Sequence, residues 1–418
     1  MKVLWITNTT FPAPSTMLNL PVPVKGGWMY SLADQLALRS DIQLAVATIY
    51  PGKDLKVITS DNVRYYLLPC NFQLKYDQSL ESFWQHICSE FVPDIVHIHG
   101  TEFSHGLACI RACQTLNYAI SIQGLIGVYS RYCYAGLSWS DIIMNITFRD
   151  IVRWNTVFHE KHKLESRGAF EREYLQLAKH VIGRTQWDYT HAKAINPTVT
   201  YHHGEEMLRN AFYSATKWSK SQKVNHLIFL SQATHPIKGM HQVLKAVALL
   251  VKEFPGISIH IAGYSLVAGN SAIERLKTSG YSLYISRLIK QYNLNDRVKF
   301  TGQLSEWQMI AEYQKAHLFV CPSSIENSPN SVGEAQILGV PTIASFVGGI
   351  PDMITHGETG LLYRFEEIEM LAENIRRVFT DDQLAERLSK QEILVAEHRH
   401  HRVINRNRTI DIYRQITS

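Results

Sequence analysis

The chain alternates short apolar runs with helix-like runs, and it does so twice. Near the start, Val3–Thr7 has the pattern of a strand and Trp28–Leu38 that of a helix. The same order returns later, where Leu227–Leu230 is followed by a helical pattern over His241–Phe254. Strands that alternate with helices favour a parallel sheet covered by helices on both faces. The sequence therefore predicts an α/β fold made of two similar halves.

A Ser/Lys-rich stretch at 214–223 has no hydrophobic periodicity and separates the halves. At 418 residues the chain is also longer than one hydrophobic core usually supports. We therefore predict two Rossmann-like domains, 1–215 and 222–402. The other predicted strands are Gln43–Thr48, Ile95–Ile98, Ala119–Ile122, Val181–Ile182, Ser258–Ala262, Val298–Thr301 and Leu318–Cys321.

Composition excludes several other classes of protein. The net charge of +5 is modest and spread along the chain, so a nucleic-acid-binding role has little support. The six cysteines lack C-x-x-C spacing, which indicates reduced core residues. No apolar run approaches the length of a membrane helix, and the first residues become polar too soon for a signal peptide. These features predict a cytoplasmic protein.

Two carboxylates stand at the end of a predicted strand in the second half. Glu326 falls in the loop after Leu318–Cys321, and Glu334 falls in a helical pattern that begins near Ser331. Ligands bind at this edge of open parallel sheets. Asn330, Ser331 and the amides of the first helical turn would offer hydrogen-bond donors to a phosphate. A carboxylate inside the helix suits the two hydroxyls of a ribose.

This stretch and the sequence after it resemble the donor-binding core of the family 4 retaining glycosyltransferases. The resemblance rests on the Glu pair together with the loop 339–341, the apolar run 342–345, the turn 348–351 and the segment 357–362. It implies the GT-B architecture, in which two Rossmann-like domains face each other across a cleft. It also implies that a C-terminal helix, here 403–418, packs back on the first domain.

Glycines and a lysine extend the resemblance to the loops that face the donor. Gly26 and Gly27 follow the first strand, where paired glycines let the backbone approach a phosphate or an acceptor. Lys238 follows the first strand of the second half and would neutralise the leaving diphosphate. Family members usually carry an arginine a few residues before this lysine. Residues 231–236 contain none, so either His235 or another basic residue substitutes for it, or the position is served differently.

Three residues at strand ends of the first half are further candidates. His99 ends the predicted buried strand 95–98, as an acceptor-side residue or as a packing residue. Gln123 stands where the family commonly has a histidine, and a glutamine cannot act as a cation. Arg184 follows the strand-like Val181–Ile182 and either replaces the missing arginine or forms a helix ion pair with Asp188.

The stretch 298–304 resembles the strand and loop that hold the nucleotide base in the family. Gly302 would permit close approach and Leu304 would pack on the base, although an ordinary strand and turn would look the same. No D-x-D pair follows a strand, and Asp381–Asp382 has the pattern of a helix N-cap. We therefore expect transfer without a metal ion or other cofactor.

Basic and aromatic residues interleave between Arg149 and Arg172. Such a stretch either lies on anionic lipid or forms an ordinary solvated helix. In the first case the protein would make a peripheral contact with the inner face of the plasma membrane.

By resemblance, Glu326 contacts the donor sugar, Glu334 the ribose, and Lys238 with the amides near Ser331 the diphosphate. The implied activity is retaining transfer of a hexose from a nucleotide-sugar to a glycan or lipid-linked oligosaccharide, in bacterial surface-polysaccharide synthesis. The sequence leaves two alternatives open. One is a nucleotide-sugar epimerase or hydrolase of the same fold, and the other is a non-catalytic nucleotide-sugar binding protein.

Overall fold

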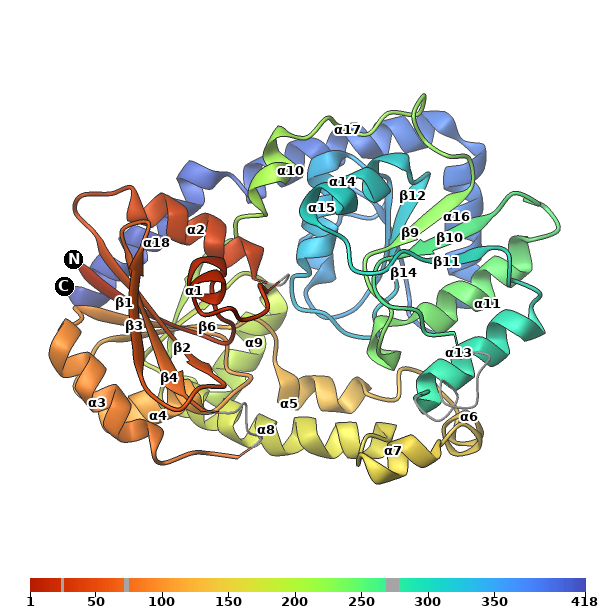
Figure 1. Cartoon of the computed structure of the whole chain (residues 1–418). Coiled ribbons are helices and arrows are strands. Elements are labelled where there is room, and N and C mark those ends of the chain that lie inside the picture. Colours follow the sequence, from red (N-terminus) through yellow and green to blue (C-terminus); the bar gives the residue numbers. More distant parts are fainter. Residues whose placement is uncertain (24–25, 71–74, 268–277) are drawn as a thin grey trace. The chain divides into compact units, whose positions relative to one another are not determined.

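The computed structural model describes residues 1–23, 26–70, 75–267 and 278–418. The chain divides into two compact units (Figure 1). Unit 1 comprises residues 1–130, 163–210 and 400–418, and unit 2 comprises residues 131–162 and 211–399. Each unit is built on a mainly parallel sheet, so the predicted α/β class is confirmed for both halves of the chain.

Unit 1 contains an eight-stranded sheet in the order β3-β4-β2-β1-β5-β6-β7-β8. Neighbouring strands are parallel except for β3, which is antiparallel to β4. The strands are β1 Lys2–Thr7, β2 Gln43–Tyr50, β3 Lys56–Ser60, β4 Val63–Pro69, β5 Ile95–His99, β6 Tyr118–Ser121, β7 His180–Gly183 and β8 Thr200–His203.

The core of unit 1 lies on both faces of this sheet. Successive side chains of a strand point to opposite faces. Accordingly, Leu4 and Ile6 of β1 join one buried cluster, while Val3 and Trp5 join another. The helices of this unit are α1 Pro12–Met17, α2 Gly27–Ala37, α3 Leu80–Phe91, α4 His105–Ala112, α5 Ile126–Tyr129, α9 Gln186–Ile195 and α18 Arg402–Thr417. Helix α8, Val157–Leu177, begins in unit 2 and continues in unit 1.

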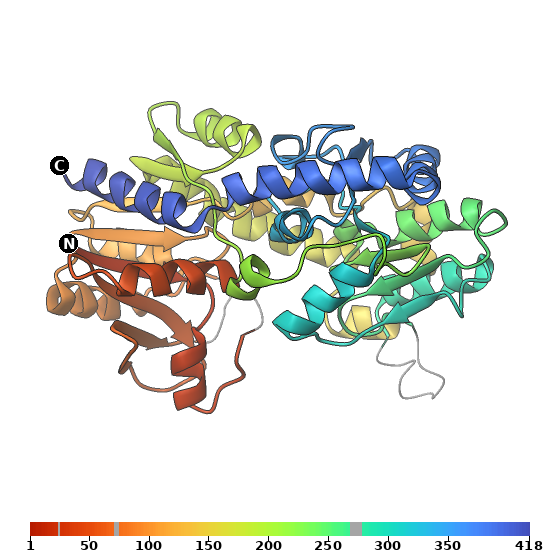
Figure 2. The same cartoon turned by 90° about the horizontal axis from the view of Figure 1, so that it is seen from above.

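The C-terminal helix α18 packs on unit 1, against α2, β5 and β6. The buried Trp5 indole donates to the Tyr413 hydroxyl over 2.9 Å and so joins the first strand to the last helix. Both chain ends therefore lie on the same unit, as Figure 2 shows. The Tyr413 hydroxyl is also 2.6 Å from Nδ1 of His97 in β5, which extends the buried polar contacts into the sheet.

Unit 2 contains six parallel strands in the order β11-β10-β9-β12-β13-β14. They are β9 Leu227–Leu230, β10 Ser258–Ile261, β11 Val298–Phe300, β12 Leu318–Cys321, β13 Thr342–Ser345 and β14 Leu361–Tyr363. The helices are α6 Trp139–Met144, α7 Phe148–Val152, α10 Asn210–Ser214, α11 Met240–Leu250, α13 Gly280–Gln291, α14 Glu306–Lys315, α15 Asn330–Leu338, α16 Ile368–Thr380 and α17 Asp382–Arg399. Short 3₁₀ turns are η1 Ser130–Tyr132, η2 Pro236–Lys238 and η3 Ile350–Asp352.

Residues 131–162 pack with unit 2, which differs from the predicted boundary at residue 215. Asp141 pairs with Arg287 of α13 at 2.7 Å, and the buried Asp150 accepts from the amide of Gly280 over 2.6 Å. His241 of α11 is 2.8 Å from the carbonyl oxygen of Ala135. These partners lie more than a hundred positions away in the chain, so local sequence patterns contain no sign of them.

Strand prediction succeeded best where the apolar runs were compact. β9 and β12 begin and end at the predicted residues, β13 coincides with the apolar run 342–345, and α18 matches the predicted C-terminal helix to within one residue at each end. The hairpin β3–β4 was missed. Its turn uses Asp61 and Asn62, both with positive φ, which is the conformation of a two-residue hairpin turn. All six cysteines are free, as predicted, but only four are core residues, because Cys70 and Cys113 are partly exposed. Across the described ranges, no helix has the length and apolarity needed to cross a bilayer.

Candidate functional site

The edge formed by the carboxyl ends of the unit 2 strands carries the predicted donor residues. β9 and β12 are neighbours and run parallel, so the segments that follow them start at the same edge of the sheet. Lys238 ends the turn η2 after β9, and Glu326 lies in the loop after β12. The Ser324 amide donates to the Ile237 carbonyl over 2.8 Å and ties the two loops together.

Lys238 and Glu326 form an ion pair between Nζ and Oε1. Glu326 also accepts from the Ser323 hydroxyl over 2.7 Å. Burial works against the charge on Lys238, but the Glu326 carboxylate outweighs it, so the pKa of this lysine is raised. The side chains are 21% and 10% exposed, respectively. Lys238 is therefore a fixed cation that still reaches the surface.

Two glycines hold the backbone of this pair in place. Gly239 follows Lys238 with φ +69°, and a Cβ there would lie 1.7 Å from the Pro322 carbonyl oxygen. Gly348 has φ +53°, and a Cβ there would lie 1.9 Å from the carbonyl oxygen of Glu326. Neither position accepts a larger residue without moving the loop. The predicted turn at 348–351 thus supports Glu326 directly, since the Gly349 amide donates to the Glu326 carbonyl over 3.0 Å.

Helix α15 begins at the same edge, at Asn330 and Ser331, as predicted within one residue. Its N-cap is Pro329, whose side chain cannot accept a hydrogen bond from the first turn. The Tyr313 hydroxyl donates to the Ser331 carbonyl over 3.0 Å and fixes the start of the helix. Glu334 lies in the second turn and is buried. The start of the helix thus presents backbone amides and a partial positive charge at the edge.

Gly302 and Leu304 follow β11, farther along the same sheet edge. Gly302 has φ +77°, and its amide and carbonyl both bond to Gly263, over 3.1 and 2.9 Å. A Cβ at Gly302 would meet no atom within 4 Å, so one side of the glycine is open. The Gly302 amide already donates to Gly263. A nucleotide base held there would therefore have to bond to the second lone pair of the Gly302 carbonyl oxygen or to a neighbouring group. Leu304 is half-buried.

The glycine pair of unit 1 follows β1 and the short helix α1. Gly26 has φ +93° and is the N-cap of α2, and Gly27 is the first residue of the helix. A Cβ at Gly27 would lie 2.4 Å from Cγ of Arg209, so the absence of a side chain allows this arginine to cross the helix start. The glycine pair thus has a packing role in unit 1, and its predicted contact with a diphosphate or acceptor stays a prediction.

His99 is the last residue of β5 and is buried. Its ring lies 4.3 Å from the Trp5 ring and 3.8 Å from the His97 ring, measured between centroids. Burial, followed by the charges of His97 and Arg184, holds the pKa of His99 well below its usual range, so the imidazole is neutral. Neither ring nitrogen has a hydrogen-bond partner within the part of the chain that the structure describes.

Gln123 and Arg184 meet at the ends of β6 and β7, which are neighbouring parallel strands. The Arg184 guanidinium donates to the Gln123 side-chain oxygen over 3.1 Å and pairs with Glu206 at 2.7 Å. Arg184 and Glu206 are 4% and 7% exposed, respectively. Asp188 accepts from the Arg184 backbone amide over 3.0 Å and, with Thr185, forms the capping box of α9. The charge of Arg184 is thus largely compensated by Glu206.

Glu171 of α8 supports the loop that follows Gln123. Its carboxylate accepts from the amides of Ile126 and Gly127 over 2.8 and 3.0 Å, at the start of α5. Burial raises the pKa of Glu171 to about 7, although these backbone hydrogen bonds act in the opposite direction. Cα of Gly127 would lie 2.5 Å from a Cβ at Gly168, so α5 and α8 cross at two glycines.

The predicted residues therefore divide between two sheet edges. Unit 2 holds Lys238, Gly302, Leu304, Glu326, Asn330, Ser331 and Glu334, and unit 1 holds Gly26, Gly27, His99, Gln123 and Arg184. Sequence reasoning missed Ser323, Glu206 and Glu171. Ser323 stands three residues before Glu326, and this short spacing could have identified it as a hydroxyl donor to the carboxylate. Glu206 and Glu171 stand in no motif, and only the fold places them beside the edge residues.

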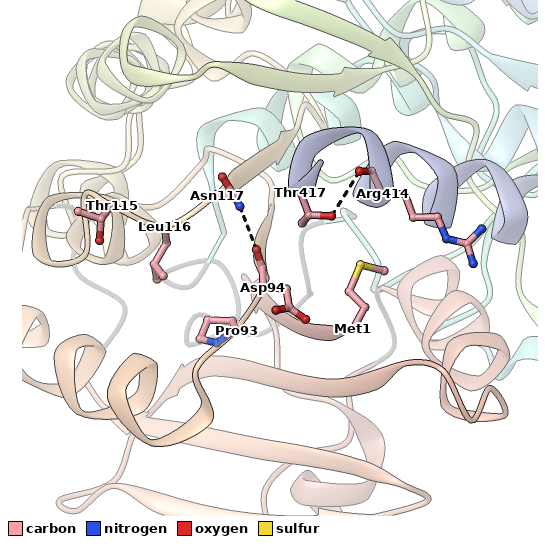
Figure 3. Close-up of a pocket in the computed structure, with 8 residues that line it drawn as sticks. All are labelled: Met1, Pro93, Asp94, Thr115, Leu116, Asn117, Arg414 and Thr417. Atoms are coloured by element: carbon pink, nitrogen blue, oxygen red, sulfur yellow. Dashed lines mark hydrogen bonds between the residues drawn. The ribbon is translucent and has the colours of Figure 1, made fainter.

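A pocket lies at the opposite edge of the unit 1 sheet (Figure 3). Its volume is about 510 Å³, and its lining includes Met1, Asp94, Asn117 and Arg414. Asp94 and Asn117 already have hydrogen-bond partners. Asp94 accepts from the Lys2 amide over 2.6 Å, and Asn117 donates to the Asp94 carbonyl over 3.2 Å. We assign no ligand to this pocket because its polar groups serve to close the amino-terminal edge of the sheet.

Comparison with known proteins links the second half of the chain to a family. Residues 214–394 match the model of the glycosyl transferases group 1. A D-inositol 3-phosphate glycosyltransferase of Corynebacterium urealyticum is 26% identical over 149 residues, 35% of this chain and 33% of the relative. A 2-deoxystreptamine N-acetyl-D-glucosaminyltransferase of Niallia circulans is 36% identical over 100 residues, 24% of this chain and 26% of the relative. The matched stretch spans a third or less of both relatives.

Solved structures match over the whole chain. Sucrose-phosphate synthase from Thermosynechococcus elongatus has a TM-score of 0.73 at 19% identity, covering 100% of this chain and 99% of that one. HepE from Anabaena, in complex with UDP-glucose, has a TM-score of 0.66 at 16% identity, covering 99% and 100%. At these identities the likeness concerns the fold. The chain has the fold of GT-B glycosyltransferases, and its residues 214–394 carry the group 1 glycosyltransferase pattern.

Proposed function

We propose that the protein is a glycosyltransferase that moves a hexose from a nucleotide-sugar to a hydroxyl of a glycan or lipid-linked oligosaccharide, with retention at the anomeric carbon. The observation that carries this proposal is the Lys238–Glu326 pair at the carboxyl edge of the unit 2 sheet. It lies inside the stretch that matches the group 1 glycosyltransferase model. HepE, which shares the fold, was solved with UDP and with UDP-glucose, in support of a nucleotide-sugar donor.

The chemical task is to stabilise charge on the departing nucleoside diphosphate. Lys238 supplies a cation at the edge, and the amides at the start of α15 supply a second positive region. Glu326 fixes Lys238 in the resting protein and would contact the donor sugar. Glu334 would accept hydrogen bonds from the ribose hydroxyls. Because these groups are held before the donor binds, little reorganisation is needed when the charge develops.

Retention would follow from attack on the face that the leaving group vacates. The bond between the anomeric carbon and the diphosphate oxygen breaks, and the acceptor hydroxyl oxygen bonds to the same face of that carbon. The hydroxyl proton passes to the leaving diphosphate, which balances the step. Lys238 lowers the cost of the charge separation, so we propose transfer without a divalent metal ion or other cofactor.

The relatives indicate which classes of acceptor to test. The inositol phosphate and deoxystreptamine transferases share sequence with this chain, so small polyol and aminocyclitol acceptors belong in any screen. WaaG, another structure with the same fold, is a glycosyltransferase involved in lipopolysaccharide biosynthesis. This supports surface-polysaccharide assembly on the cytoplasmic face as the biological setting that we propose.

Two measurements test the proposal. A thermal-shift screen over UDP-, GDP- and ADP-sugars identifies the donor, because a ligand at about 100 times its Kd stabilises the folded chain by about 2.7 kcal/mol. The selected donor is then incubated with and without a panel of acceptors. We expect release of the nucleotide to require an acceptor. Conversion of the donor in the absence of acceptor would instead identify an epimerase or hydrolase, and binding without turnover would identify a binding protein.

A further inference from the structure

Large apolar side chains gather at the surface of α6, α7 and the turn after α7. Their exposed fractions run from 57% to 71%, although such side chains are usually buried. Exposed large apolar side chains that fall within one short segment are typical of an interaction surface. We call them the α6–α7 patch, and its members are Trp139, Ile143, Met144, Phe148, Ile151, Val152 and Trp154.

The segment that carries the patch is held firmly from its other side. Asp141 pairs with Arg287 at 2.7 Å, and Asp150 accepts from the Gly280 amide at the start of α13. A Cβ at Gly280 would lie 2.4 Å from the carbonyl oxygen of Asn145, so the backbones approach closely there. Figure 1 shows α6 beside α13. The patch is thus a preformed surface whose helices cannot turn inward without breaking these contacts.

The charges of the segment favour an anionic partner. Its two acidic side chains, Asp141 and Asp150, are both used to hold α13. Arg149 pairs with Asp150 at 3.5 Å, whereas Arg153 is exposed and has no ion pair within the described ranges. Between Trp139 and Trp154 the charge left at the surface is therefore positive.

We propose that the α6–α7 patch docks the protein on the surface of an anionic lipid bilayer. Tryptophan at both ends of the patch suits the polar–apolar boundary of a membrane, since the indole has an apolar body and one N–H donor. Phe148, Ile151 and Met144 enter the apolar layer, and Arg153 meets the lipid phosphates. This inference goes beyond sugar transfer and does not depend on it.

The patch differs from the basic and aromatic stretch that the sequence indicated, 149–172. Only the first part of that stretch is an exposed apolar surface. In unit 1, Arg167 donates to the Glu102 carbonyl over 2.8 Å and lies over the Phe103 ring. Phe170 packs against the core cluster of unit 1. The membrane contact is therefore assigned to 139–154.

The test is co-sedimentation of the full chain with vesicles. One set contains phosphatidylcholine alone, and the other contains about one third phosphatidylglycerol. We expect binding to the anionic vesicles that weakens by about tenfold or more in Phe148→Ser combined with Trp154→Ser, because two large apolar side chains leave the interface. Arg153→Gln should weaken binding by about fivefold on anionic vesicles only, since each basic residue near such a surface contributes about 1 kcal/mol.

The matched control is Trp307→Ser combined with Leu394→Ser. These side chains are each 60% exposed but lie on α14 and α17, outside the patch. Their replacement should leave vesicle binding unchanged, with thermal unfolding recorded for every variant. The proposal is overturned if the wild-type chain does not co-sediment with anionic vesicles, or if the patch variant binds them as well as the control variant does. It is also overturned if light scattering without lipid shows a dimer that the patch variant abolishes, since the patch then joins two copies of the chain.

Discussion

Both sheet edges place a cation against a carboxylate, yet the two pairs differ in what they leave exposed. In unit 2, Lys238 pairs with Glu326 and keeps a fifth of its side chain at the surface. In unit 1, Arg184 and Glu206 are almost completely buried, and Arg184 also holds Gln123. Removing one partner of a buried ion pair destabilises the fold, because the other charge is left buried and uncompensated. A partly exposed cation, in contrast, remains available to an anionic ligand. This difference predicts a structural role for Arg184 in unit 1 and, under the proposed function, a reactive role for Lys238 in unit 2.

The sharpest test of this contrast is Arg184→Ala. Glu206 would be left buried without its partner, so we expect a loss of about 3 to 5 kcal/mol in unfolding free energy. The double variant Arg184→Ala with Glu206→Ala should recover part of this loss, because no uncompensated carboxylate remains. Urea unfolding measures both. Normal stability with a collapse in turnover would instead make Arg184 the second cation that the sequence suggested.

Lys238→Ala tests the reactive side of the comparison. The charge on the leaving diphosphate grows toward the transition state, so turnover should fall by about a hundredfold to a thousandfold. Donor affinity should change much less. Lys238→Arg, which keeps the charge, is the matched control and should retain more activity. If kcat and affinity fall together by the same factor, Lys238 binds the donor without assisting its departure.

Glu334→Ala tests the ribose contact at the same edge. Loss of a charged hydrogen-bond acceptor costs about 1.5 to 3 kcal/mol, roughly tenfold to a hundredfold in affinity for the nucleotide product. Calorimetric titration of the nucleoside diphosphate measures this change. A weaker effect for the matching 2′-deoxy nucleotide would support the contact with the ribose hydroxyls. Unchanged affinity would remove Glu334 from the site.

A further prediction concerns the pH dependence of stability and applies to Glu171 in unit 1. In the folded chain the pKa of Glu171 is raised to about 7, above its unfolded value, so its stabilising contribution is complete at low pH and is lost as pH rises through 7. Relative to Glu171→Gln, the wild type should therefore lose about 2 kcal/mol between pH 5 and 7.5. Thermal unfolding at several pH values gives this difference. A constant difference would mean that the carboxyl group stays ionised throughout.

The sequence was most informative where function depends on neighbours along the chain. Glu326, Ser331 and Glu334 fall within one strand–loop–helix segment, and the structure keeps them on that segment. The turn at 348–351 was likewise readable from the sequence. Lys238 was assigned from its place after β9, and its ion pair with Glu326 joins residues 88 positions apart.

The unit 1 edge was harder to predict because its contacts are set by sheet order. β5, β6 and β7 are adjacent only after folding, so nothing in the chain placed Arg184 beside Gln123 or Glu206. The same holds for residues 131–162, whose helices are short and whose anchoring residues bind α13 far along the sequence. Sequence patterns predict helices, strands and local motifs. Ion pairs between distant loops become visible only once the fold is known.

The most direct test of sugar transfer at the unit 2 edge is turnover in excess EDTA, with the product followed by NMR. We predict that an α-linked donor yields an α-linked product and that the rate survives chelation, because in the proposed reaction Lys238 and the start of α15 would take the place of a divalent ion. A product of inverted configuration would contradict retention. Loss of turnover that magnesium or manganese restores would contradict the roles proposed for Lys238 and the start of α15.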